Sequence, residues 1–233
     1  MWRRASTWAA EAAAVFAKEW RCEFRTRYAL NTLALFALTT LVTISVSLGP
    51  LGISLAHGTG VLPVLLWLIL LFAAAAGLPR AFVHEEETQS ATALRLAARP
   101  STVFAGKLAY GATLTAALEA LITPLYLAVM SSAVARPGLL IAALAAGGYG
   151  LAAGSTLVAA IIAQARGKAT LFAVLSFPVL LPLVLMAVAL SREAFAGGGA
   201  AGTTAEMTLM QLFLYDASVT VAGLMLFPVV WNP

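Results

Sequence analysis

RAFVHEEETQSATALRLAARPSTVFAGK, residues 80–107, carries much of the charge of an otherwise apolar chain of 233 residues. Three glutamates, residues 85–87, lie near its start, and Arg95 and Arg99 follow. If this part is helical, its acidic side chains lie at the N-terminal end and its basic ones at the C-terminal end, the order that a helix dipole favours. Pro100 ends such a helix. The stretch therefore predicts a short polar helix between two apolar runs, either a solvated loop or a docking surface.

The composition of the chain predicts an integral membrane protein. Hydrophobic residues make up 61% of it and charged residues 10%, whereas soluble domains carry about 25% charged residues. At roughly 20 apolar residues per spanning helix, the length predicts an all-α membrane protein with little extramembrane structure. The net charge of +4 does not indicate nucleic acid, because basic residues gather in the cytoplasmic loops of membrane proteins.

Residues 1–27 predict an amphipathic helix that lies along the membrane surface. Apolar side chains recur at about every fourth position, at Trp8, Ala12, Val15, Phe16, Trp20 and Phe24. Arg21, Arg25 and Arg27 occupy the far side. Aromatic residues opposite basic ones are typical of an interfacial helix, although a helix packed on a partner protein shows the same pattern.

Residues 28–233 predict a domain of six transmembrane helices. The expected spans are residues 28–48, 60–78, 103–130, 138–163, 169–190 and 207–230, and residues 193–206 read as a small-residue linker. Twelve of the 14 Lys and Arg residues lie on the side of the N-terminal helix, and only Arg136 and Arg192 lie on the other. The positive-inside rule therefore predicts a multi-pass membrane protein with both termini and residues 80–107 in the cytoplasm.

Two carboxylates fall within the expected spans, Glu119 in the third and Asp216 in the sixth. Intramembrane carboxylates are costly and mark a functional site or an interhelical hydrogen bond. A proton relay and a substrate contact are both open here, but we favour a structural role, with a neutral Glu119 bonded to a neighbouring hydroxyl. The small residues 147–155, GGYGLAAGS, allow close helix approach, and ordinary dense packing explains them best.

No motif for catalysis or for direct cofactor binding is found. Asp216 is the only aspartate, so a pair of catalytic aspartates is excluded, and His57 and His84 lie on opposite sides of the membrane in the expected topology. The Gly167-Lys168 pair lacks the rest of a P-loop. The sequence therefore predicts a non-enzyme without a catalytic, cofactor or metal site, for which a partner would hydrolyse any ATP.

Three stretches resemble the CcmB family, the ABC-2-type permease of the cytochrome c maturation system, often called haem exporter protein B. They are RAFVHEEETQSATALRLAARPSTVFAGKLAY at residues 80–110, ITPL at 122–125, and ARGKATLFAVLSFPVLLPLVLMA at 165–187. Their order and spacing, rather than any one motif, carry the resemblance. The final span is not similar in detail, so no role for Asp216 follows from the family.

The resemblance implies a permease subunit of the bacterial inner membrane without its own catalysis. Such a subunit pairs with a CcmA-like ATPase and with CcmC-like and CcmD-like membrane proteins, and ATP hydrolysis is tied to release of a haem-loaded CcmE-like chaperone. ATP and haem would thus be handled by partners, and His57 is read as a solvated residue rather than a haem ligand. The segment between spans two and three would be a coupling helix that docks on the ATPase through Arg80, Glu85, Glu86, Glu87, Leu94 and Arg95.

Two other functions fit the same layout. One is a different ABC-2 permease that exports a drug, a lipid or a polysaccharide. The other is a stand-alone transporter in which Glu119 couples transport to protons. Both have the same apolar spans, so the hydropathy pattern alone does not distinguish them from a CcmB-like permease subunit.

Overall fold

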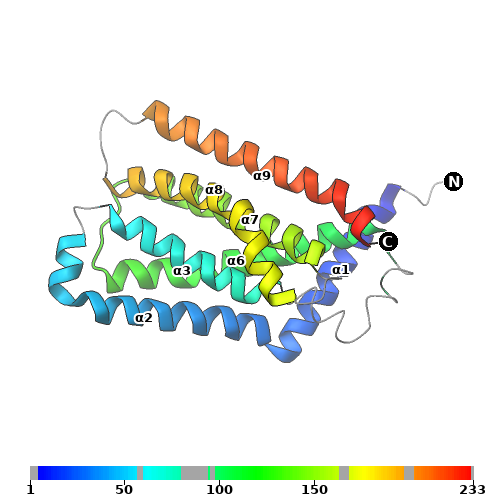
Figure 1. Cartoon of the computed structure of the whole chain (residues 1–233), viewed down its shortest axis with the longest axis horizontal. Coiled ribbons are helices and arrows are strands. Elements are labelled where there is room, and N and C mark those ends of the chain that lie inside the picture. Colours follow the sequence, from blue (N-terminus) through cyan, green and yellow to red (C-terminus); the bar gives the residue numbers. More distant parts are fainter. Residues whose placement is uncertain are drawn as a thin grey trace.

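A computed structural model describes residues 5–56, 60–79, 94, 98–162, 168–196 and 202–231. Within these residues all of the regular secondary structure is helical, which confirms the predicted fold class (Figure 1). The helices are α1 (Ala5–Thr26), α2 (Tyr28–Ala56), α3 (Val61–Gly77), α6 (Pro100–Val129), α7 (Pro137–Ile162), α8 (Lys168–Ala196) and α9 (Gly202–Trp231).

Within the described residues, five helical stretches are long and apolar enough to cross a membrane. They are Tyr28–Gly49, Pro100–Val129, Pro137–Ile162, Val174–Ala196 and Thr204–Trp231, and each lies where a span is predicted. The remaining predicted span forms α3, which is apolar but has only 17 residues, the short end of the range that spans a bilayer.

Two helix ends differ from the prediction. Gly49 has φ 62° and ψ 179° and interrupts α2 where the first span is expected to end, but helix resumes and continues to Ala56. The predicted linker over residues 193–206 is mostly wrong, because α8 continues to Ala196 and α9 begins at Gly202. Residues 193–196 are Glu, Ala, Phe and Ala, none of which stops a helix as glycine does.

The bundle has α7 at its centre. In the most apolar stretch of α7, 83% of the residues are buried, against 17% in α2 and in α9. Figure 1 shows α2 and α9 on opposite sides of the bundle. These two helices therefore expose most of their apolar surface to whatever surrounds the protein.

The two ends of the bundle are built differently. At one end α1, the start of α6 and the end of α9 meet (Figure 1), and the ring of Phe227 packs between those of Phe104 and Trp231. At the other end the Arg136 amide donates a hydrogen bond to the Ala194 carbonyl over 2.9 Å, and the Arg192 guanidinium donates one to the Gly60 carbonyl. Arg136 and Arg192, the two basic residues predicted on the side away from the N-terminal helix, therefore lie at the same end of the bundle, away from α1.

Candidate functional site

Most of the predicted docking segment lies outside the described residues. Arg80, Glu85, Glu86, Glu87 and Arg95 all fall there, and so does His57. Leu94 is described. It is partly buried and packs on a core cluster that includes Val103 and Phe104 of α6, so Leu94 contacts the bundle itself.

The segment leads directly into α6, and the first turns of α6 are bound to α1. Lys107 donates a hydrogen bond from Nζ to Oε1 of Glu19 over 2.9 Å. Only 1% of the surface of Lys107 is exposed. The side chain of Lys107 is therefore enclosed between α1 and α6.

The charge of Glu19 is held by two lysines. Burial alone would raise the pKa of Glu19, but the ammonium groups of Lys107 and Lys18 oppose this effect and hold the pKa below its ordinary value. The Lys18 ammonium lies 3.1 Å from the same carboxylate oxygen. A buried ion pair of this kind is stable only when its charges are matched and hydrogen-bonded, and here both conditions are met.

Glu23, one turn further along α1, joins three helices. Its Oε1 accepts a hydrogen bond from the Leu30 amide over 2.8 Å, which satisfies one of the free N–H groups at the start of α2. Its Oε2 accepts one from the Tyr110 hydroxyl of α6 over 3.1 Å. The carboxylate of Glu23 therefore fixes α1, α2 and α6 relative to one another.

Apolar packing completes this contact. A Cβ added at Gly106 would lie 2.7 Å from Cβ of Val15, so only glycine lets α6 approach α1 this closely. The ring of Trp20 packs edge-on against Tyr110 at 5.8 Å. We call the contact of Val15, Glu19 and Glu23 with Gly106, Lys107 and Tyr110 the α1–α6 seam.

The seam shows which face of α1 is buried. The helix itself is confirmed, but Val15, Glu19 and Glu23 form its buried face, while Trp8 and Phe24 are 41% and 64% exposed. The apolar face predicted for this helix includes neither Glu19 nor Glu23. Their four-residue spacing from Val15 was a possible signal, but it could not be read without knowing that Lys107 lies opposite.

The two intramembrane carboxylates are buried as predicted. Glu119 is 8% exposed and Asp216 is 3% exposed. Within the described residues, Oε1 of Glu119 and both carboxylate oxygens of Asp216 have no hydrogen-bond partner. The expected hydroxyl partner of Glu119 is thus not found at Oε1.

Glycines of α7 make room for both carboxylates. A Cβ at Gly148 would overlap the Glu119 carboxylate, and a Cβ at Gly150 would overlap that of Asp216. Gly147 likewise gives space to the indole of Trp67, whose Nε1 donates to the Ser191 hydroxyl over 2.8 Å. The small residues of α7 therefore serve dense packing, as expected, and two of them also seat a carboxylate.

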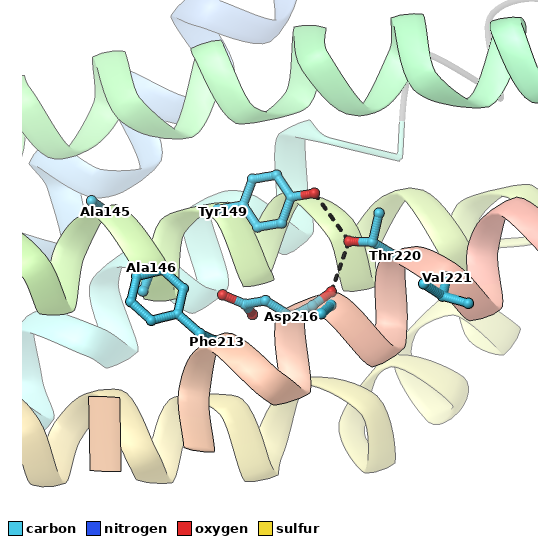
Figure 2. Close-up of a pocket in the computed structure, with 8 residues that line it drawn as sticks. Ala145, Ala146, Tyr149, Phe213, Asp216, Thr220 and Val221 are labelled. Atoms are coloured by element: carbon cyan, nitrogen blue, oxygen red, sulfur yellow. Dashed lines mark hydrogen bonds between the residues drawn. The ribbon is translucent and has the colours of Figure 1, made fainter. Parts of the chain in front are cut away.

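Asp216 lies at a groove between α7 and α9, which we call the α7–α9 groove (Figure 2). The groove has a volume of about 580 Å³ and is lined by Ala145, Ala146, Tyr149, Phe213, Asp216, Ala217, Thr220 and Val221. The hydroxyls of Tyr149 and Thr220 are hydrogen-bonded at 3.0 Å. Thr220 also donates to the backbone carbonyl of Asp216 over 2.7 Å, so neither hydroxyl reaches the Asp216 carboxylate.

A metal centre has no basis in the part of the chain that the structure describes, where no three His, Cys, Asp or Glu side chains gather. The polar groups there can pair charges and position helices. The α1–α6 seam does so within the chain, next to the segment expected to meet an ATPase.

Comparison with known proteins supplies the family. No curated protein matches the chain. The family model described as CcmB protein matches residues 10–228, a range that runs from α1 into the last turn of α9 and includes both the docking segment and the seam. The chain is thus a multi-pass membrane protein that belongs to the CcmB family of haem-exporter ABC permease components.

Proposed function

We propose that this chain is the permease subunit that couples ATP hydrolysis by a partner ATPase to release of a haem-loaded chaperone during cytochrome c maturation. It would lie in the bacterial inner membrane with six spans, α3 being the second, and with both termini in the cytoplasm. Membership of the CcmB family supports the assignment. The predicted partners are a CcmA-like ATPase, CcmC-like and CcmD-like membrane proteins and, indirectly, a CcmE-like chaperone.

The observation that carries the coupling proposal is the α1–α6 seam. Segment 80–97 precedes α6 by only two residues, and α6 is joined to α1 within its first turns through Lys107 and Glu19. Separating a buried ion pair of this kind costs about 3–5 kcal/mol. A displacement of the segment by an ATPase would therefore move α6 and α1 together rather than one past the other.

The residues predicted for docking are Arg80, Glu85, Glu86, Glu87, Leu94 and Arg95. Since Leu94 packs on the core of the bundle, we assign it to the anchoring of the segment and the charged residues to the ATPase contact. ATP and haem are handled by the partners, and this subunit takes no catalytic part.

Charge reversal tests the docking role. We expect Glu86→Lys and Arg95→Glu to lower the stimulation of the partner ATPase about tenfold, the effect of losing roughly 1.4 kcal/mol of coupling energy, while membrane insertion stays normal. Glu206→Lys, a charge reversal at the start of α9, is the matched control and should leave stimulation unchanged. Normal cytochrome c assembly in both docking variants would refute the proposal.

A further inference from the structure

Asp216 is a buried carboxylate that the described chain leaves without a partner. It lies halfway along the 30-residue α9, is 3% exposed and has no hydrogen bond at either carboxylate oxygen. The hydroxyls of Tyr149 and Thr220, which line the same groove, are bonded to each other and to a backbone carbonyl. Protonation of Asp216 would not remove the need for a partner, because a neutral carboxyl group also requires hydrogen bonds, both as donor and as acceptor.

Among the described residues, the two helices that line the groove supply no counter-charge to Asp216. Neither α7 nor α9 contains a Lys, Arg or His. In the other described spans, the basic residues lie near helix ends, as Lys107 does in α6 and Arg192 in α8. A second copy of this chain would therefore bring no cation to the depth of Asp216 from its described helices.

The groove at Asp216 has walls that suit the packing of a further helix. Its walls include Ala145, Ala146 and Ala217, and small residues let a neighbouring backbone approach closely in a membrane. Phe213 and Val221 on its rim are exposed. Figure 2 shows the Asp216 side chain directed between α7 and α9, beside Ala146 and Phe213.

The geometry points to a docking site for a transmembrane helix of a partner subunit, which places a Lys, Arg or His side chain opposite Asp216 in the α7–α9 groove. Charge complementarity selects this occupant, since an ionised carboxylate in hydrocarbon needs a cation. The outer face of α9 is largely uncovered and leaves space for such a helix. The inference does not require ATPase docking, because the groove and segment 80–97 are separate parts of the chain.

Photo-crosslinking of the full-length protein in its native membrane tests this site. A photoreactive phenylalanine derivative replaces Val221 at the groove rim, with Met225 and Val46, exposed positions of α9 and α2 outside the groove, as controls. We expect Val221 to label a transmembrane segment of another protein that carries a basic residue within about one helical turn of the labelled position. Asp216→Asn should lower that yield about tenfold or more, and Glu206→Gln should not change it.

A charge swap separates loss of the pair from misfolding. Asp216→Lys should abolish labelling on its own and recover it when the basic residue of the partner is replaced by Asp. Adducts with lipid alone, with a second copy of this chain, or with a segment that lacks a basic residue would overturn the inference. So would equal yields in the wild type and Asp216→Asn, or failure of the swap to restore labelling.

Discussion

The α1–α6 seam and the α7–α9 groove both bury carboxylates, but they treat them in opposite ways. In the seam, Glu19 meets Lys107 and Lys18, and both oxygens of Glu23 accept hydrogen bonds. In the groove, Asp216 has no hydrogen-bond partner in the part of the chain that the structure describes. The described chain therefore pairs its buried charges where α1 joins the bundle and leaves the Asp216 carboxylate without a partner halfway along α9.

This contrast separates two roles for buried charge. A pair enclosed within one chain fixes the arrangement of its helices, and removing one member is costly. A carboxylate without an internal partner contributes little to that arrangement, so its contribution is expected only when another molecule is present. The predictions for the seam and the groove test the two sides of this contrast in the isolated subunit, and one prediction for α7 adds a packing change for comparison.

The largest effect is expected for Glu19→Ala. The change leaves the Lys107 ammonium, which is 1% exposed, without the carboxylate that Glu19 supplies, and should lower the free energy of unfolding by about 3 kcal/mol. Thermal unfolding of the purified protein in detergent measures the loss. The double variant Glu19→Ala with Lys107→Met should recover most of it, because an apolar pair replaces a buried ion pair at little cost. A double variant as unstable as the single one would contradict the role of the charge.

The same pair predicts how stability depends on pH. The folded pKa of Glu19 is lowered below an unfolded value of about 4.3, so its contribution is complete above that pH and is lost as the pH falls through the folded value. The stability difference between the wild type and Glu19→Gln should stay constant from about pH 7 to 5 and narrow below about pH 4. A difference that already disappears near neutral pH would exclude this assignment.

Overpacking of α7 comes next. Gly147→Ala places a Cβ into the indole of Trp67, which is fully buried and hydrogen-bonded to Ser191. An extra methyl group in a tightly packed core costs about 2 kcal/mol. Gly138→Ala, where nothing lies within 4 Å of the added Cβ, is the matched control and should be close to neutral. Equal unfolding midpoints for the two variants would mean that α7 shifts to accept the methyl group.

The positions of the helices could be predicted because each span is a long apolar run bounded by Gly, Pro or charge. The prediction failed at residues 193–206, where a high content of small residues concealed four further helical positions of α8. The α1–α6 seam could not be predicted, since Glu19 and Lys107 are 88 residues apart and each looks like a surface charge in its own segment. Burial of Asp216 followed from its span, but its lack of a partner depends on where Tyr149 and Thr220 direct their hydroxyls. The docking residues of segment 80–95 remain a prediction.

A smaller loss is expected for Tyr110→Phe in the seam. The substitution removes the hydroxyl that donates to Oε2 of Glu23 but keeps the ring that packs on Trp20. A hydrogen bond to a charged group contributes about 1.5 kcal/mol, and the unfolding midpoint should fall accordingly. Tyr149→Phe makes the same chemical change at the groove, where the lost contact is exposed, and serves as the control. Equal losses of stability in the two variants would contradict a larger contribution of the seam hydrogen bond than of the exposed one at Tyr149.

The smallest effect is expected for Asp216→Asn. The two side chains have nearly the same shape, and the carboxylate makes no hydrogen bond to the described chain, so the unfolding midpoint of the isolated subunit should correspond to a change within about 0.5 kcal/mol. The matched substitution in the seam, Glu19→Gln, also replaces a carboxylate by an amide but weakens an ion pair at 2.9 Å, and it should be clearly destabilising. Both are measured by thermal unfolding in the same detergent. A loss at Asp216 as large as that at Glu19 would show that Asp216 stabilises this subunit on its own, and the distinction between the seam and the groove would then fail. Since the expected change at Asp216 is so small, any larger effect of Asp216→Asn in the native membrane would have to arise from a molecule that the isolated subunit lacks.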